Sequence, residues 1–159
     1  MGGEQKCKLF DASGNNMKKE PFWKTKTLNE MTHDEWESLC DGCGICCLEK
    51  LEDKKTGEIK LLSISCQFLD TTNCRCMIYD HRMFLNPDCF QLSPDNLIHI
   101  RWLPHTCAYR CVHEGRELEW WHPLVCGDPN AIHKEGVSIR DRVVSGHYVH
   151  HEDILNQSK

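Results

Sequence analysis

Four cysteines lie within eight residues of this chain, in the segment Cys40-Asp-Gly-Cys43-Gly-Ile-Cys46-Cys47. The chain of 159 residues contains 12 cysteines in all. A short loop with glycines can direct several thiolates toward one point, and zinc and iron both accept tetrahedral sulfur ligation. The sequence therefore predicts a fold that is organised around a cysteine-bound metal ion or cluster.

The overall charge and hydropathy of the chain indicate which partners it does not require. The net charge is −5, from 19 basic and 24 acidic residues, and neither sign forms a long block. This balance gives no electrostatic reason to expect binding to nucleic acid or to an anionic membrane. The N-terminal segment 1–21 lacks the apolar core of a secretory signal, and no apolar run approaches the length of a membrane span.

These features predict a cytoplasmic protein with reduced thiols. Cytosolic glutathione and thioredoxin keep cysteines reduced, so the cysteines are interpreted as metal ligands or reactive thiols rather than as disulfides. An oxidised scaffold in a secreted protein is the alternative, and the missing export signal argues against it.

The length fits one domain of the α+β class, with short helices, a β-hairpin and extensive loops. We expect residues 1–20 to form a flexible tail, in which Cys7 is a free thiol, and residues 21–159 to form the cysteine-cluster metal-binding domain. Thr32-His-Asp-Glu35 is a capping-box sequence, which predicts a short helix that leads into the cysteine loop.

Further elements are predicted from turn residues and apolar periodicity. A hairpin is expected from strands at 48–51 and 58–64, and residues 66–89 are expected to be mostly loop. Helices are expected at 96–103, at 106–114 and, in frayed form, from residue 151.

The cysteine spacing is compatible with more than one metal. Cys40, Cys43 and Cys46 have the C-x2-C-x2-C spacing of a ferredoxin cluster loop, and the same two-residue gap forms half of a zinc knuckle. Cys47 should face a different environment from Cys46, because neighbouring side chains project in different directions. Five more candidate donors bring the total to nine, which favours two centres or one centre plus redox-active thiols: Cys66, Cys74, Cys76, Cys89 and Cys107.

Several other residues of the sequence have two interpretations each, one at a metal centre and one as ordinary structure. Cys111 and Cys126 could be ligands, but burial as small apolar residues explains them at least as well. His122 could lie beside a cluster, although simple packing with the adjacent tryptophans is favoured. Four basic residues could balance the negative charge of a thiolate centre or could be ordinary solvated surface: Lys50, Arg75, Arg82 and Arg110.

Several segments together resemble the bacterial CxxCxxCC proteins, which are described as a zinc- or iron-chelating domain family. The similarity runs through the segment 35–47 and continues in Pro87-Asp88-Cys89, Trp102-Leu103-Pro104, Thr106-Cys107-Ala108-Tyr109-Arg110 and Trp121-His122-Pro123-Leu124. The resemblance implies metal ligation by the nine cysteines named above. Cys7, Cys111 and Cys126 are extra to the family pattern.

The sequence thus favours a metal-binding protein over an enzyme. It has no phosphate-binding loop, no nucleophile elbow and no H-E-x-x-H motif. The leading hypothesis is a cytoplasmic metalloprotein with a cysteine-ligated iron–sulfur cluster or zinc, and the ferredoxin-like loop favours iron–sulfur slightly. The alternatives are a redox protein, for electron transfer or thiol oxidoreduction, and a protein of metal trafficking or sensing.

Overall fold

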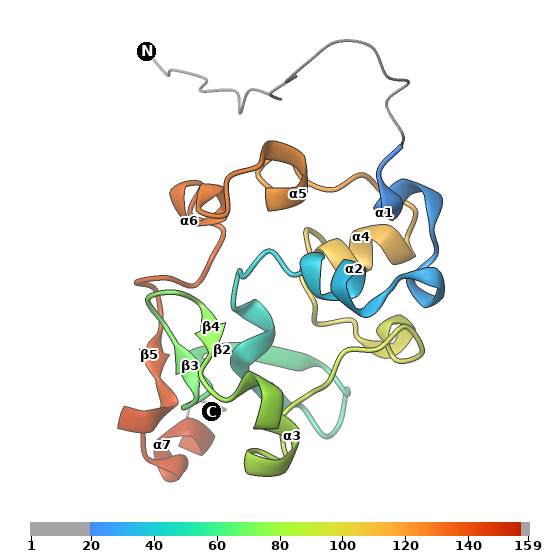
Figure 1. The fold of residues 1–159 in the computed structure, drawn as a ribbon. Helices are drawn as coiled ribbons and strands as arrows, with labels where there is room; N and C mark the ends of the chain where they lie inside the picture. The colour runs from blue at the N-terminus through green and yellow to red at the C-terminus, as the bar shows by residue number, and fades with distance from the viewer. Residues whose placement is uncertain (1–19, 157–159) are drawn as a thin grey trace, which may run out of the picture. The chain divides into compact units, whose positions relative to one another are not determined.

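The computed structural model describes residues 20–156 of the chain, and this part divides into two compact units. The first unit combines the chain up to Asp41 with Pro104–Glu135, and the second combines Gly42–Leu103 with the chain from Gly136 onward. Short helices, a β-hairpin and long loops make up the fold (Figure 1), so the predicted α+β class is confirmed. The predicted tail and Cys7 lie outside the described residues, apart from Glu20.

The described elements of the first unit are helices and one 3-10 turn, η1. They are α1 (Phe22–Thr25), η1 (Leu28–Glu30), α2 (His33–Ser38), α4 (Ala108–His113), α5 (Pro123–Cys126) and α6 (Ala131–Lys134). The capping box that the sequence predicted for α2 is present. Thr32 Oγ1 accepts a hydrogen bond from the amide of Glu35 at 3.2 Å, and the Glu35 carboxylate accepts one from the amide of Thr32 at 2.8 Å. Two otherwise unpaired amides are satisfied in this way.

Helices α2 and α4 lie side by side in the first unit (Figure 1). The rings of Trp36 and Tyr109 are 4.6 Å apart between centroids, and the Tyr109 hydroxyl donates to the Trp36 carbonyl at 3.0 Å. Helix α4 ends at His113, and Gly115 stops it as predicted, because this glycine adopts a left-handed conformation with φ +67°. The aromatic contact therefore fixes the helix that precedes the cysteine loop.

His122 anchors the end of α2 through its buried imidazole. Its Nδ1 accepts a hydrogen bond from the Leu124 amide at 3.1 Å, so the proton resides on Nε2, which donates to the Leu39 carbonyl at 3.0 Å. His122 is only 2% exposed and Leu39 is fully buried. Since Leu39 directly precedes Cys40, the imidazole fixes the backbone at the start of the cysteine motif.

Replacement of His122 by alanine should destabilise the first unit. The substitution leaves a buried carbonyl and a buried amide without their partner and creates a cavity, at a cost of about 3 kcal/mol in the free energy of unfolding. Chemical denaturation of the full chain measures this loss. The control is His113→Ala at an exposed position of α4, which should change stability by less than about 0.5 kcal/mol. Equal effects of the two substitutions would contradict the anchoring role.

The second unit contains two small sheets and several helical turns. Its elements are η2 (Ile45–Cys47), β1 (Leu48–Glu52), β2 (Ile59–Ser65), β3 (Leu69–Asp70), β4 (Arg75–Cys76), η3 (Tyr79–His81), α3 (Arg82–Leu85), η4 (Leu97–His99), β5 (Val144–Ser145), η5 (Gly146–Tyr148) and α7 (His151–Asn156). Strands β1 and β2 form the predicted antiparallel hairpin, and β5 pairs parallel to β2. Strands β3 and β4 form a separate antiparallel pair.

The predicted helix at 96–103 is wrong, because the structure has only the 3-10 turn η4 there. The Asn96 side chain accepts a hydrogen bond from the Ser93 amide at 2.9 Å and donates one to the Gln91 carbonyl at 2.8 Å. Local side-chain hydrogen bonds of this kind compete with helical hydrogen bonds. Residues 66–89, expected to be mostly loop, contain the short elements from β3 to α3.

The cysteine loop packs against a small apolar cluster of the second unit. Leu69, Cys74 and Ile139 form its buried centre, and Cys47 is among the residues packed around it. The Ile139 amide donates to the Cys43 carbonyl at 2.9 Å. Gly44 has φ +76°, and a Cβ at this position would lie 2.7 Å from Ile139 Cγ1. Glycine is thus required at residue 44 by both the backbone conformation and the close approach of Ile139.

Gly44→Ala should cost about 2 to 4 kcal/mol of stability, because a left-handed backbone strain adds to a clash with Ile139. Gly57→Ala is the matched control. Gly57 has φ +71°, but no atom lies within 4 Å of its would-be Cβ, so only the backbone strain of about 1 kcal/mol applies. Thermal or urea denaturation measures the difference. If the two variants were equally stable, the packing of the cysteine loop against Ile139 would be in doubt.

Candidate metal centre

The nine predicted ligands are divided between the two units. Cys40 and Cys107 belong to the first unit, where Cys40 is exposed after α2 and Cys107 immediately precedes α4. The other seven belong to the second unit. Ligation by Cys40 and Cys107 stays a prediction, and the geometry below concerns the second unit.

Four cysteines of the second unit come together from four separate segments, and we refer to them as the thiol cluster. Backbone hydrogen bonds join three of these segments: the Cys66 amide donates to the Cys47 carbonyl at 2.7 Å, and the Leu69 amide donates to the Cys66 carbonyl at 3.0 Å. Leu69 in turn pairs with Cys76 in the β3–β4 ladder. The cluster consists of Cys46, Cys66, Cys76 and Cys89.

The thiols of this cluster lie within reach of one another's charge. Burial raises the pKa of the Cys66 thiol, and charges on Glu49, Cys89 and Cys76 would raise it further. Burial likewise raises the pKa of Cys89, with smaller contributions in the same direction from Cys76 and Cys46. Thiolates at these positions repel one another, so a bound cation among them would stabilise the ionised form.

Cys46 and Cys47 are closer together than the sequence analysis expected. Their sulfur atoms are 4.0 Å apart, and sulfurs of a tetrahedral zinc–thiolate site are separated by about 3.8 Å for a metal–sulfur distance of about 2.3 Å. Both cysteines lie in the 3-10 turn η2, which ends at Cys47 directly before strand β1. The surroundings still differ, since Cys47 also packs against the apolar cluster.

Cys74 is surrounded by apolar groups. Its side chain is 4% exposed within the apolar cluster, and its backbone has φ +53°. Burial raises the pKa of its thiol, while the charge of Arg140 and a hydrogen bond with Ser138 act in the opposite direction. A protonated, packed thiol is the state that this environment stabilises in the metal-free protein.

Cationic side chains lie close to the thiol cluster. The charges of Arg82 and Lys50 both oppose the effect of burial on the Cys89 thiol. The Arg82 guanidinium lies 3.8 Å from the Tyr79 ring centroid and donates to the Tyr79 carbonyl at 2.9 Å. The Arg75 guanidinium lies beside Gly42, where a Cβ would be 3.2 Å from its Cζ. Two of the predicted charge-balancing residues, Lys50 and Arg82, are therefore near the cluster.

The donor set of the cluster fits a soft metal, since thiolates are the preferred ligands of zinc and of iron–sulfur clusters. Among the described residues, however, no group of three or more His, Cys, Asp or Glu side chains already converges on a common point as a metal site.

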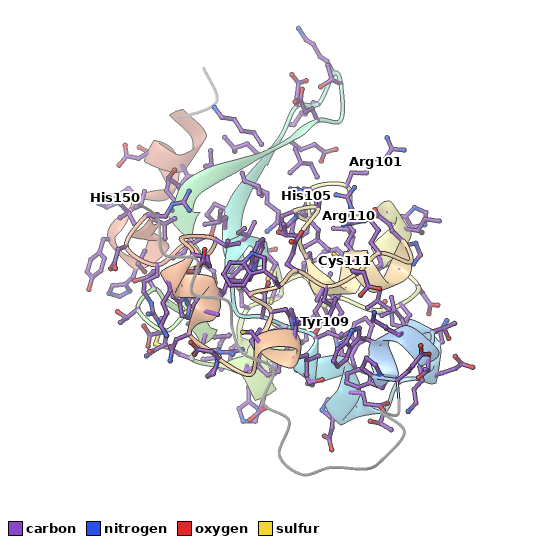
Figure 2. The ribbon with its side chains drawn as sticks, turned by 90° about the horizontal axis from the view of Figure 1, so that it is seen from above. Arg101, His105, Tyr109, Arg110, Cys111 and His150 are labelled. Carbon is purple, nitrogen blue, oxygen red and sulfur yellow. The ribbon has the colours of Figure 1, made fainter. Side chains whose placement is uncertain are left out.

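The two extra cysteines of the described chain have local partners in the first unit. The Cys111 residue is fully buried, and its thiol donates to the His105 carbonyl at 3.4 Å. Figure 2 labels both residues. The Cys126 thiol donates to the Trp121 carbonyl at 3.4 Å. Burial of Cys111 as a small apolar residue is confirmed, and burial in the core also accounts for His122.

Two contacts near the cluster are not predicted by the sequence. Asn86 donates to the Cys66 sulfur at 3.6 Å, and Trp102 packs over the Lys50 ammonium. No sequence spacing connects either residue to its partner, because both contacts depend on how the loops of the second unit fold.

Comparison with known proteins gives the family of this chain. Residues 39–108 match the CxxCxxCC family, described as "Putative zinc- or iron-chelating domain". A UPF0260 protein of Sinorhizobium fredii is 59% identical over 84% of this chain and 86% of its own length, and one of Allorhizobium ampelinum is 56% identical over 86% of each. The chain belongs to the UPF0260 group of CxxCxxCC proteins. No solved structure matches it.

Membership of the CxxCxxCC family supports metal binding and agrees with the resemblance found in the sequence. The family description names zinc and iron together, so the metal itself belongs to the proposal below. In the part of the chain that the structure describes, none of the helices has both the length and the apolar character needed to cross a membrane.

Burial should make the cysteines of this CxxCxxCC protein differ in reactivity. The thiolate is the nucleophile, so a raised pKa and a buried sulfur both slow alkylation. We expect iodoacetamide to modify exposed Cys40 at least tenfold faster than Cys111 in the reduced, metal-free protein at pH 7.5. Mass spectrometry of peptides over time measures both rates, and the rate at Cys111 should rise with pH above the usual thiol pKa. Faster modification of Cys111 than of Cys40 would contradict the structure.

Proposed function

We propose that this protein binds a metal ion or iron–sulfur cluster through thiolates, and that the thiol cluster Cys46, Cys66, Cys76 and Cys89 supplies the principal ligands of its second unit. The observation that carries the proposal is that backbone hydrogen bonds hold three cysteine segments together, those of Cys46, Cys66 and Cys76. Charge at Cys89 reaches Cys66, and charge at Cys46 and Cys76 reaches Cys89, so the fourth segment also lies nearby. Cys47 is a candidate fifth donor, because its sulfur is 4.0 Å from that of Cys46.

Iron–sulfur chemistry is favoured slightly over zinc. The loop Cys40-x-x-Cys43-Gly-x-Cys46 resembles a ferredoxin cluster loop in spacing, and of its three cysteines Cys46 belongs to the thiol cluster. Gly42 and Gly44 both have left-handed backbones, which allow the loop to bend tightly around a centre. A bound zinc ion would cross-link the loops structurally, and a bound iron–sulfur cluster would allow electron transfer. A cytoplasmic location, where thiols stay reduced, belongs to the same proposal.

The test is metal and sulfide analysis, together with a visible absorption spectrum, on protein purified without oxygen from cells supplied with iron and zinc. The account predicts one tightly held thiolate centre in the second unit. Separate Cys66→Ser, Cys76→Ser and Cys89→Ser variants should each lose most of the metal, because serine is a poor ligand for soft metals.

The matched control is Cys126→Ser, a half-buried cysteine of the first unit outside the cluster, which should retain the full metal content. Circular dichroism shows whether each variant is folded. If the folded wild-type protein carries no metal, the proposed function fails. If it carries metal that the three cluster variants all retain, the function stands but the assignment of ligands fails.

A second candidate function is metal transfer to another protein. It is favoured by the partial exposure of all four cluster cysteines, which leaves the sulfurs accessible to a competing ligand. Transfer of bound zinc or cluster to an acceptor thiolate peptide within minutes would support this function, whereas retention for many hours would favour a structural or electron-transfer centre.

A further inference from the structure

Lys50 reaches back from strand β1 toward the thiol cluster. Its Nζ donates to the carbonyl of Cys46 at 2.8 Å and to the carbonyl of Leu48 at 2.8 Å. The β1–β2 register shifts between Leu48 and Lys50, so this stretch of β1 departs from regular pairing where the lysine begins. The two hydrogen bonds fix the ammonium next to the backbone that carries Cys46.

Trp102 covers this ammonium. The Nζ of Lys50 lies 4.3 Å from the centroid of the Trp102 ring, a cation–π distance. The Trp102 ring also packs edge-to-face against Phe90, with centroids 5.8 Å apart, and Phe90 directly follows Cys89. The indole therefore connects the lysine to a second segment of the cluster and shields the ammonium from water.

The ammonium is partly desolvated, and both of its hydrogen-bond acceptors are neutral carbonyl oxygens. Burial lowers the pKa of Lys50, while negative charges at Cys46, Cys47, Glu49 and Cys89 raise it. A cation removed from water is stabilised when an opposite charge lies nearby. Three of the four groups that can provide this charge are cysteines at or beside the cluster.

We propose that Lys50, held in place by Trp102, is the built-in counter-cation of the metal centre and a positioning residue that raises its affinity for metal. The inference rests on the proposed function. A divalent zinc ion with four thiolates has a net charge of −2, and a four-thiolate iron–sulfur cluster is also an anion. A fixed positive charge on the Cys46 side of the cluster stabilises this anionic complex more than the neutral thiols of the metal-free protein.

The test compares Lys50→Gln, Lys50→Met and Lys50→Arg with the wild-type protein. Affinity for zinc is measured by competition with a chromophoric chelator, and binding of cobalt(II) gives the visible spectrum of the thiolate site. Lys50→Gln and Lys50→Met both remove the positive charge, and Lys50→Gln retains a hydrogen-bond donor for the carbonyls of Cys46 and Leu48. We expect both neutral variants to bind zinc about 10- to 100-fold more weakly, the range typical of groups that surround metal ligands. Arg should stay within about threefold of wild type.

The matched control is Lys60→Met. Lys60 lies on β2, opposite Leu51 of β1, and is exposed to solvent, so this substitution makes the same change in charge at the surface of the same hairpin. It should leave the zinc affinity unchanged within about twofold, because exposed charges are screened by salt. Should Lys50→Met fail to fold by circular dichroism, the Gln and Arg pair decides the question.

Each outcome has one meaning. The proposal is supported if Lys50→Gln binds zinc more weakly than the wild-type protein while Lys50→Arg binds it about as tightly. If Lys50→Gln, Lys50→Arg and the wild-type protein bind zinc with equal affinity and show an intact thiolate–cobalt spectrum, the counter-cation role is overturned. The proposed function then still stands. Equal losses in Gln and Arg also overturn the counter-cation role, since the geometry of the lysine rather than its charge would then matter. Absence of zinc and cobalt binding in the wild-type protein itself is instead a failure of the proposed function.

Discussion

Mutual repulsion among closely spaced thiolates is the constraint on which this structure depends. The second unit brings Cys46, Cys66, Cys76 and Cys89 within reach of one another's charge, and burial opposes ionisation of Cys66 and Cys89 in addition. A cation bound among them would oppose both effects at Cys66 and Cys89, because it stabilises the ionised thiolate.

The cysteines that the structure describes differ in how deeply they are buried. Cys74 and Cys111 are buried as small apolar residues, the first in the apolar cluster and the second in α4. The cluster cysteines are only partly buried. Burial therefore distinguishes the environment of Cys74 and Cys111 from that of the cluster cysteines, and ligation by Cys74 stays a prediction.

Local signals in the sequence predicted the parts of the fold that depend on local contacts. The capping box at Thr32 and the hairpin from β1 to β2 need only neighbouring residues, and both are present. The helix expected at 96–103 failed because the Asn96 side chain forms hydrogen bonds to nearby backbone. At the candidate site, spacing indicated the ligand-rich loop, but the contact of Lys50 with Trp102 joins residues that only tertiary structure brings together.

The central claim is that sulfur atoms of this protein bind a metal, and X-ray absorption spectroscopy of the protein as purified without oxygen tests it most directly. The account predicts a first coordination shell of about four sulfur atoms at about 2.3 Å, with an additional iron shell if the centre is an iron–sulfur cluster. A shell made of nitrogen and oxygen atoms at about 2.0 to 2.2 Å would contradict the account, because the metal would then be held by groups other than the cysteines.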